Sequence, residues 1–172
     1  TEFHIELFVK NLLGYENSSI VRQFAPNKIV RTGWPMDYMQ DTLAPYKDLP
    51  KRDLVLFPHR IAPEKQVEIF RDLAKELPQY EWFVAQDQPL TKDEYHTHMA
   101  ESKLMFSASL QETLGIGAYE AALVGTLPVL PDRLSYEEMW KMDGFYPSKW
   151  TEDWDSYVNN KGQLVNFIKF LM

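Results

Sequence analysis

Short apolar runs alternate with segments of helical periodicity through the middle of the chain. Apolar runs suited to buried strands cover residues 53–57, 80–85, 104–108 and 126–130. The segments between them space their apolar residues as helices do, over residues 63–77, 91–101 and 115–124. Strands and helices that alternate through short links form right-handed βαβ units. The pattern therefore predicts the α/β fold class, with a Rossmann-like doubly wound parallel sheet.

Residues at the ends of the predicted helices support these boundaries. Thr91 is followed three residues later by Glu94, which is the pattern of a capping box. Pro78 is expected to stop the first of the three helices, and Gly125 the third. The helix limits are therefore predicted from local chemistry as well as from periodicity.

The N-terminal third of the chain shows weaker patterns. An amphipathic helix is predicted over the first 13 residues, with Phe3, Leu7 and Phe8 on its apolar face. The remaining predictions are a short helix capped by 17–19, a strand at 28–31, a turn at 32–35 and a linker at 41–52.

The C-terminal segment differs from the middle of the chain. A final helix is predicted over 162–172, after a cluster of aromatic and acidic residues. We accordingly divide the chain into connecting and opening elements at 1–50, a Rossmann-like core at 51–149 and a helical tail at 150–172.

Composition removes several functional classes. The net charge of −7 argues against a protein that binds nucleic acid through bulk electrostatics. The chain has no cysteine, which excludes disulfides and cysteine zinc sites. No apolar run approaches the roughly 20 residues that span a bilayer, so we expect no membrane span and a cytoplasmic location. The chain does not begin with Met, and we expect it to have been cut from something longer.

The loop and helix after the third predicted strand contain the most informative residues. A helix N-terminus favours anions, and Gly115 and Gly117 would let a ligand approach the backbone. Glu112 lies in the loop and Glu120 in the helix, where each carboxylate could accept hydrogen bonds from sugar hydroxyls. The alternative is that both are ordinary solvated acids.

Two cations follow the first predicted strand. Arg60 and Lys65 lie at the same sheet edge, because parallel strands end together, and two cations suit a diphosphate. The alternative is a turn with solvated charges. We predict that Arg60, Lys65, Glu112 and Glu120 surround one pocket beside a helix start.

These residues, in this order, resemble the C-terminal domain of family-four-type retaining glycosyltransferases of the GT-B fold. The resemblance extends over about residues 53–139. It rests on the pair His59-Arg60 with Lys65, on Glu112 and Glu120, and on residues 125–129. Within that group, His59-Arg60 and residues 131–136 are most similar to the branch that includes tRNA-queuosine mannosyltransferase.

The resemblance implies a donor-binding domain, one half of a GT-B fold, for a nucleotide sugar such as a UDP- or GDP-hexose. The enzyme would transfer a hexosyl group with retention, without a metal or other cofactor. Arg60, Lys65 and Glu112 would be the catalytic residues, because cations and helix N–H groups stabilise a departing diphosphate. The donor-binding residues would be Arg60 and Lys65 at the diphosphate, Glu112 at the sugar, the backbone of Thr113, Leu114 and Gly115 at sugar and phosphate, Glu120 at the ribose, and Gln86 and Ser107 near the nucleoside.

The sequence also departs from the family. Family members often have Gly before the Arg, where this chain has His59, and the branch follows its Tyr with Pro-Glu, where this chain has Glu137-Glu138. A GT-B enzyme needs a second Rossmann-like domain for its acceptor, and residues 1–50 are too few to form it. We therefore expect a missing N-terminal acceptor domain or a partner subunit, and an isolated domain without turnover. A nucleic-acid acceptor is suggested only by the branch resemblance, and the acidic charge gives it no support.

Two other functions stay open on sequence grounds. One is a non-catalytic α/β interaction domain that keeps the fold, and the other is a GT-B sugar-nucleotide epimerase. Two further motifs are weak. Residues 115–120 form a dinucleotide fingerprint that lacks its third Gly, and Asp153-Trp154-Asp155 matches the Asp-x-Asp of metal-dependent transferases without a preceding strand.

Overall fold

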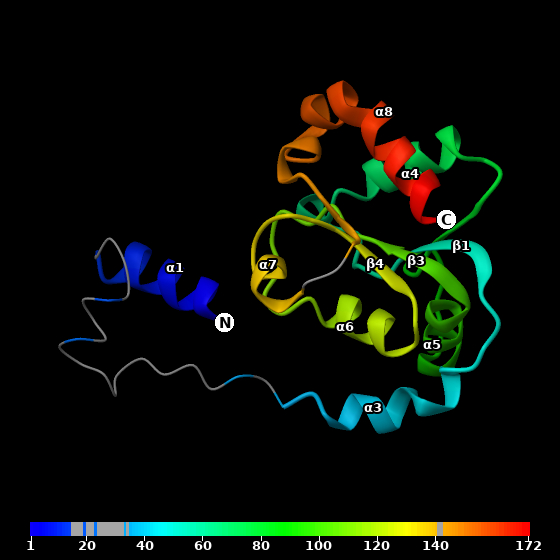
Figure 1. Ribbon diagram of the computed structural model, residues 1–172, viewed down its shortest axis with the longest axis horizontal. Coiled ribbons are helices and arrows are strands. Elements are labelled where there is room, and N and C mark those ends of the chain that lie inside the picture. Colours follow the sequence, from blue (N-terminus) through cyan, green and yellow to red (C-terminus); the bar gives the residue numbers. More distant parts are fainter. Residues whose placement is uncertain (15–18, 20–22, 24–32, 34, 141–142) are drawn as a thin grey trace.

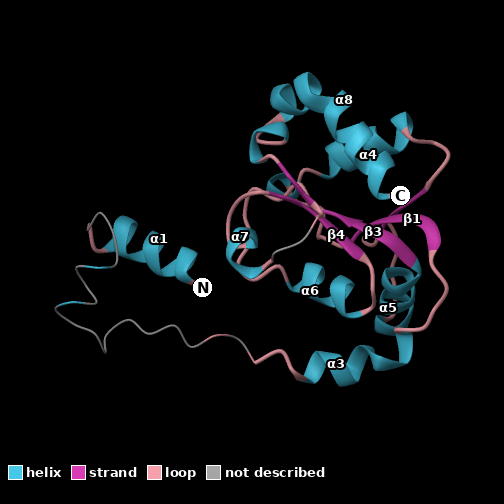
Figure 2. Ribbon diagram, in the orientation of Figure 1, coloured by secondary structure: helices cyan, strands magenta, loops and turns pink. Residues whose placement is uncertain are grey.

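A five-stranded, all-parallel sheet forms the centre of the molecule (Figures 1 and 2). The computed structural model describes residues 1–14, 19, 23, 33, 35–140 and 143–172. The strands are β1 (Arg52–Phe57), β2 (Glu81–Val84), β3 (Ser102–Phe106), β4 (Leu127–Pro131) and β5 (Phe145–Tyr146), in the order β2-β1-β3-β4-β5. This arrangement confirms the predicted Rossmann-like doubly wound α/β fold.

The central strands are apolar because helices cover both faces of the sheet. Val55, Leu56 and Phe57 of β1 are fully buried, which explains the continuous apolar run in the sequence. Successive side chains of a strand point to opposite faces. Accordingly, Val55 and Phe57 belong to one apolar cluster and Leu56 to the other.

Two helices cover one face of the sheet, and several shorter ones cover the other. The first face carries α4 (Val67–Glu76) and α8 (Trp154–Leu171), as Figure 2 shows. The opposite face is covered by α3 (Tyr38–Leu43), α5 (Lys92–Glu101), α6 (Ile116–Leu123) and α7 (Tyr136–Met139). Each layer encloses its own apolar core, as the doubly wound architecture requires.

The last helix is longer than predicted. α8 begins at Trp154 because Asp153 caps it, its Oδ1 accepting a hydrogen bond of 2.7 Å from the Ser156 N–H. The expected start at residue 162 is therefore wrong, since Gly162 lies inside the helix. Among the described residues, no helix combines the length and the apolar character needed to cross a membrane.

Polar contacts fasten α8 to α4. The Tyr157 hydroxyl donates to Asp72 Oδ2 over 2.8 Å, and Lys161 Nζ lies 3.0 Å from the same oxygen and 2.8 Å from Glu76 Oε1. Together with the apolar contacts of Leu164 and Ile168, these polar contacts hold the C-terminal helix against the layer that packs on the sheet.

Other elements also differ from expectation. The predicted linker at 41–52 contains the second half of α3 and the 3₁₀ turn Ala44–Tyr46, because Leu43 packs in the core and Pro45 occupies a helix start, where proline is tolerated. The predicted helix at 63–77 is divided into the 3₁₀ turn Pro63–Lys65 and α4 by Gln66, whose φ is 53°. The short elements β5 and α7 were not predicted. The predicted helix at 17–24, strand at 28–31 and turn at 32–35 lie largely outside the described residues.

The first helix is present, but its predicted apolar face is wrong. α1 (Glu2–Leu12) buries Ile5 and Val9, whereas Leu7 and Phe8 are exposed. Glu138, two residues after the start of α7, accepts hydrogen bonds from the Glu2 and Phe3 N–H groups over 2.9 and 3.0 Å. A carboxylate in this position satisfies free N–H groups and favours the helix dipole.

Candidate functional site

The strand order places a topological switch point between β1 and β3. From β1 the chain passes outward to β2, and from β3 it passes to β4 and β5 on the other side. In sheets of this kind, ligands bind outside the carboxyl ends of the strands at that point. Two segments meet there, the β1 loop (residues 58–66) and the β3 loop (residues 107–115).

A lysine and a glutamate join the two loops. Lys65 Nζ donates to Glu112 Oε2 over 3.1 Å and to the Gln111 carbonyl oxygen over 2.5 Å. The side chains of Lys65 and Glu112 are only 10% and 18% exposed, respectively. The Leu110 N–H also donates to the Glu64 carbonyl oxygen over 2.8 Å. The two loops are therefore held together across the switch point before any ligand binds.

Glu112 is held in its ionised form. Burial alone would raise the pKa of this carboxyl group, but Lys65 and the N–H groups of Thr113 and Gly115 more than offset that effect and lower it. The Thr113 N–H donates to Oε1 over 2.9 Å. Glu112 is thus a partly buried, charged acceptor, and the alternative of an ordinary solvated loop acid does not describe it.

Arg60 lies at the mouth of the same site. Its side chain is 67% exposed, and its guanidinium pairs with Glu64, four residues further along the chain. A pocket of about 520 Å³ is lined by His59, Arg60, Lys65, Glu112, Thr113, Leu114, Ile116 and Gly117. We call it the anion pocket. Three of the four charged side chains that were expected to share a pocket therefore do so.

A second opening reaches these charges from the side of α1. It also measures about 520 Å³ and shares Arg60, Lys65, Glu112 and Thr113 with the anion pocket. Phe3, His4 and Leu7 of α1 form its far wall. The N-terminal helix therefore borders the same charged residues, a placement that periodicity alone did not suggest.

The start of α6 adds hydrogen-bond donors to the anion pocket. The N–H groups of Ile116 and Gly117 occupy the first turn, where no acceptor within the helix is available, and no side chain caps them. Both residues line the pocket. Unpaired N–H groups and the positive end of the helix dipole favour an anion at this position.

Protein contacts require one of the two glycines of this helix start. Gly115 has a φ of 65°, and a Cβ added to it would lie 2.8 Å from Cε1 of Tyr136. A Cβ on Gly117 would lie 3.4 Å from Cγ of Pro58, which is an ordinary van der Waals distance. The contacts of Gly115 therefore explain that glycine, whereas those of Gly117 do not demand one.

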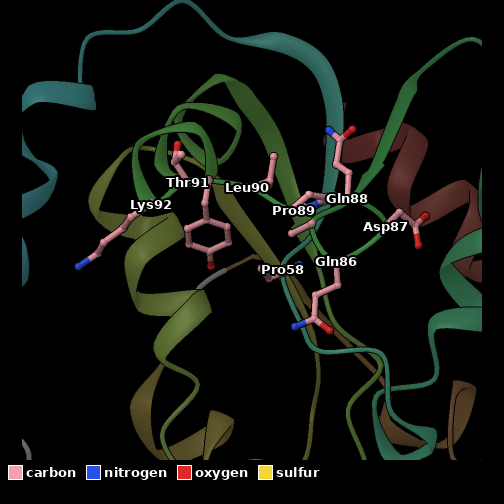
Figure 3. Close-up of a pocket in the computed structure, with 10 residues that line it drawn as sticks. Pro58, Gln86, Asp87, Gln88, Pro89, Leu90, Thr91 and Lys92 are labelled. Carbon is pink, nitrogen blue, oxygen red and sulfur yellow. The ribbon is translucent and has the colours of Figure 1, made fainter.

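A neighbouring pocket opens on the other side of the β1 loop. It measures about 650 Å³ and lies between the ends of β1 and β2 and the start of α5 (Figure 3). We call it the nucleoside pocket, because Gln86, which the sequence predicts near a nucleoside, lines it. It is lined by Pro58, Ala85, Gln86, Asp87, Gln88, Pro89, Leu90, Thr91, Lys92 and Tyr95. Since Pro58 lines this pocket and His59 the anion pocket, the two pockets adjoin.

Gln86 has a defined orientation in the nucleoside pocket. Its Oε1 accepts a hydrogen bond of 2.9 Å from the Ile61 N–H in the β1 loop. The oxygen is therefore directed at the loop, and the amide NH₂ remains as the donor. The predicted place of Gln86 near a nucleoside stays a prediction.

Glu120 does not line the anion pocket. It lies one turn further along α6, where its Oε2 accepts from the Tyr95 hydroxyl over 3.2 Å and its Oε1 is 3.9 Å from His96 Nε2. Burial raises its pKa, and the Tyr95 hydroxyl and Lys92 only partly offset this. Because Tyr95 lines the nucleoside pocket, Glu120 is connected to that pocket instead. Sequence reasoning missed Tyr95, whose only signal is its position one turn after the capping residue Thr91.

Ser107 is placed differently from expectation. Its side chain is buried, with Oγ 3.0 Å from Ser109 Oγ and 3.2 Å from the Tyr136 hydroxyl. A serine whose hydroxyl is enclosed by protein groups cannot contact a nucleoside directly. We therefore assign Ser107 to the support of the β3 loop and not to the ligand surface.

His59 is a buried polar group with no assigned partner. Its Nε2 is inaccessible and has no hydrogen-bond partner among the described residues. Burial and the nearby Lys65 lower its pKa to about 4, against a smaller opposing effect of Glu112. The imidazole next to Arg60 is therefore neutral at physiological pH.

Neither a scan against protein-family models nor a search of curated proteins finds a match to this chain. Within the part of the chain that the structure describes, no three His, Asp or Glu side chains converge so as to hold a metal ion. The structure therefore shows a Rossmann-like α/β domain with a charged pocket at its switch point.

Proposed function

We propose that this chain is the donor-binding domain of a retaining glycosyltransferase, and that its substrate is a nucleoside diphosphate sugar such as a UDP- or GDP-hexose. The observation that carries the proposal is the Lys65–Glu112 pair across the switch point, with Arg60 and the α6 N-terminus beside it. This arrangement offers positive groups for phosphate and a negative group for hydroxyls within one pocket.

The diphosphate would occupy the anion pocket between Lys65, Arg60 and the start of α6. Lys65 uses two of its three N–H donors within the protein, which leaves one for a phosphate oxygen. Arg60 is exposed and can turn from Glu64 toward the ligand at little cost, because exposed ion pairs contribute only about 0–1 kcal/mol. The N–H groups of Ile116 and Gly117 would complete the contacts.

The sugar would lie against Glu112. An ionised carboxylate has about four acceptor positions, and Lys65 and Thr113 account for only some of them. The remaining positions can accept hydrogen bonds from a pair of sugar hydroxyls. The lowered pKa of Glu112 keeps this acceptor charged throughout the neutral range.

The nucleoside would extend past Pro58 into the nucleoside pocket. Gln86 would offer its amide NH₂ to the base, and Glu120, held by the Tyr95 hydroxyl, is nearest to the expected position of the ribose. The adjoining pockets match the elongated shape of a nucleotide sugar, with the charged part in the middle. Ser107 has no part in this assignment.

The reaction proposed for the complete enzyme is hexosyl transfer. The bond between the anomeric carbon and the diphosphate oxygen breaks with its electron pair on that oxygen, and the acceptor oxygen bonds to the same face of the sugar while its proton passes to the departing diphosphate. The negative charge that develops on the diphosphate is stabilised by Lys65, Arg60 and the helix N–H groups. The residues that bind the acceptor substrate would come from a second domain or a partner subunit. The isolated domain is therefore expected to bind the donor without turnover.

Calorimetric titration of the domain with UDP, GDP and their hexose conjugates tests this proposal. We expect one of the two nucleotides to bind, and Arg60→Ala to weaken it by about 3- to 30-fold, the loss of one charge-assisted contact. Glu112→Gln should remove the extra affinity contributed by the sugar but not the affinity for the nucleotide alone, because Glu112 contacts the hydroxyls.

A matched control is available at the opposite edge of the sheet. Arg52 is also an exposed arginine in ion pairs, with Glu81 and Glu101, at the start of β1. Arg52→Ala should leave nucleotide binding unchanged. The proposal is contradicted if neither nucleotide binds to the wild-type domain, or if Arg60→Ala and Arg52→Ala have equal effects.

A further inference from the structure

A layer of buried and partly buried polar groups contacts the β3 loop. Its largest member is Arg133, which follows β4. The guanidinium donates from Nη2 to the Ala108 carbonyl oxygen over 2.8 Å and from Nε to that of Ser109 over 2.9 Å. It also donates from Nη1 to the Thr151 carbonyl oxygen over 3.1 Å.

Gln66 reaches the same two segments from the opposite side. Its side chain is buried, and Nε2 donates to the Ala108 carbonyl oxygen over 2.7 Å and to that of Thr151 over 2.8 Å. Ala108 and Thr151 therefore each accept from both Gln66 and Arg133. Gln66 directly follows Lys65. The residue whose side chain holds the β3 loop is therefore the chain neighbour of the residue that pairs with Glu112.

The Arg133 guanidinium acts here as a planar group of hydrogen-bond donors and not as a free cation. Every acceptor found for its guanidinium is a carbonyl oxygen or the Thr151 hydroxyl. Burial lowers its pKa, although an arginine keeps its charge in proteins. The planar guanidinium reaches several carbonyl groups in fixed directions, which a lysine with three donors at one point cannot reproduce.

Unusual backbone conformations accompany both side chains. Among the described residues, Gln66 (φ 53°) and Leu134 (φ 62°) are the non-glycine positions with positive φ. One follows Lys65 and the other follows Arg133. Such conformations cost on the order of 1–3 kcal/mol each and persist where surrounding contacts hold them. Here those contacts are the hydrogen bonds of the buried polar layer.

We infer that Arg133 and Gln66 are positioning residues that fix the β1 and β3 loops, so that Lys65 and Glu112 meet across the switch point. They act through the Ala108 and Ser109 carbonyl groups, three to four residues before Glu112. The same bonds reach Thr151, in the turn before α8, and so tie the docking of the C-terminal helix to the geometry of the site. The consequence for ligand binding rests on the proposed function, whereas the effect on the Lys65–Glu112 pair does not.

The experiment measures the pKa of the Glu112 carboxyl group by ¹³C NMR titration, which needs no ligand. Arg133→Met keeps an unbranched stem but removes the guanidinium with its donors, and Gln66→Asn shortens the amide side chain while favouring positive φ. We expect the pKa of Glu112 to rise in both variants, because the carboxylate moves away from Lys65. Arg133→Lys should not restore the wild-type value, since the charge alone is insufficient.

A milder variant keeps the test valid if the others fail to fold. Thr151→Val removes only the hydroxyl, which accepts from Arg133 Nη2 over 3.1 Å and lies 3.2 Å from the Tyr146 hydroxyl. It should raise the pKa of Glu112 less than Arg133→Met does. Lys51→Met provides the control, because it removes partly buried hydrogen bonds at the opposite sheet edge and should leave the pKa of Glu112 unchanged.

Two outcomes separate this inference from the proposed function. An unchanged pKa of Glu112 in the folded Thr151→Val and Arg133→Met proteins would overturn the positioning role, whatever the ligand. If wild-type protein binds neither UDP nor GDP, the proposed function fails while a raised pKa still supports positioning. If it does bind, we expect Arg133→Met to weaken nucleotide binding by about tenfold, roughly the loss of one well-placed charged contact.

Discussion

At the level of single residues, the site depends on charges that are paired with other protein groups. Lys65 and Glu112 neutralise each other across the switch point at 3.1 Å, and Arg60 is paired with Glu64. Two such cations can face a diphosphate without repelling each other in its absence. Glu120 differs from Glu112, because burial raises its pKa and the Tyr95 hydroxyl and Lys92 only partly offset this effect.

The residue types could be predicted from sequence, but their partners could not. Arg60, Lys65 and Glu112 were identified because they follow apolar strands, and strand ends meet at one edge of a parallel sheet. The separation of Glu120 from the anion pocket depends on the phase of α6 and on its hydrogen bond with Tyr95, neither of which periodicity defines closely enough. The burial of Ser107 depends on Tyr136, which is 29 residues away in the chain.

His59 provides a prediction about pH at this scale. Its folded-state pKa of about 4 lies below the ordinary value of 6.5, so folding favours the neutral ring. The contribution to stability is complete above pH 6.5 and is lost as the pH falls from 6.5 through about 4. We expect NMR titration to show the imidazole neutral down to about pH 5.

A stability comparison checks the same point. Urea unfolding at pH 7 and pH 5 should show a smaller loss of stability on acidification in His59→Gln than in the wild type, because the variant has no ring to protonate. A His59 pKa near 6.5, or equal acid sensitivity of the two proteins, would show that this imidazole is not shielded as described.

At the level of elements, local chemistry decided which helix limits could be predicted. The capping box of Thr91 and Glu94 forms as expected, with the Glu94 N–H donating to Thr91 Oγ1 over 3.2 Å. The break at Gln66 could not be predicted, because its positive φ is stabilised by carbonyl groups at 108 and 151. The early start of α8 was missed because Asp153 was interpreted as part of an acidic tail.

Lys51 tests how two of these elements are joined. Its Nζ donates to the Ala100 carbonyl oxygen at the end of α5 over 2.7 Å, to that of Val124 at the end of α6 over 2.9 Å, and to Thr126 Oγ1 over 2.8 Å. Helix C-termini favour a cation in this position. Lys51→Met should lower the free energy of unfolding by about 1–3 kcal/mol, measured by urea denaturation.

The same variant should bind nucleotide as the wild type does, because Lys51 lies at the sheet edge opposite the switch point. Lys103→Met is a suitable comparison, since Lys103 is a partly exposed lysine on the same edge paired with Asp53 and should cost less. Equal stability of the Lys51→Met and wild-type proteins would mean that the lysine does not hold the helix ends together.

At the level of the whole molecule, the strand order creates the site. The order β2-β1-β3-β4-β5 makes the β1 and β3 loops neighbours although their charged residues are 47 positions apart. Right-handed crossovers restricted the possible orders, but the sequence alone did not select this one. The buried layer of Arg133 and Gln66 could not be predicted either, because it depends on contacts among four separate segments.

A crystal structure of the domain with the more tightly bound of UDP and GDP tests the central claim most directly. We predict the diphosphate within hydrogen-bond distance of Lys65 and the first N–H groups of α6, and the base in the nucleoside pocket beside Gln86. A nucleotide bound away from the switch point, or one whose phosphates avoid Lys65 and α6, would contradict the account.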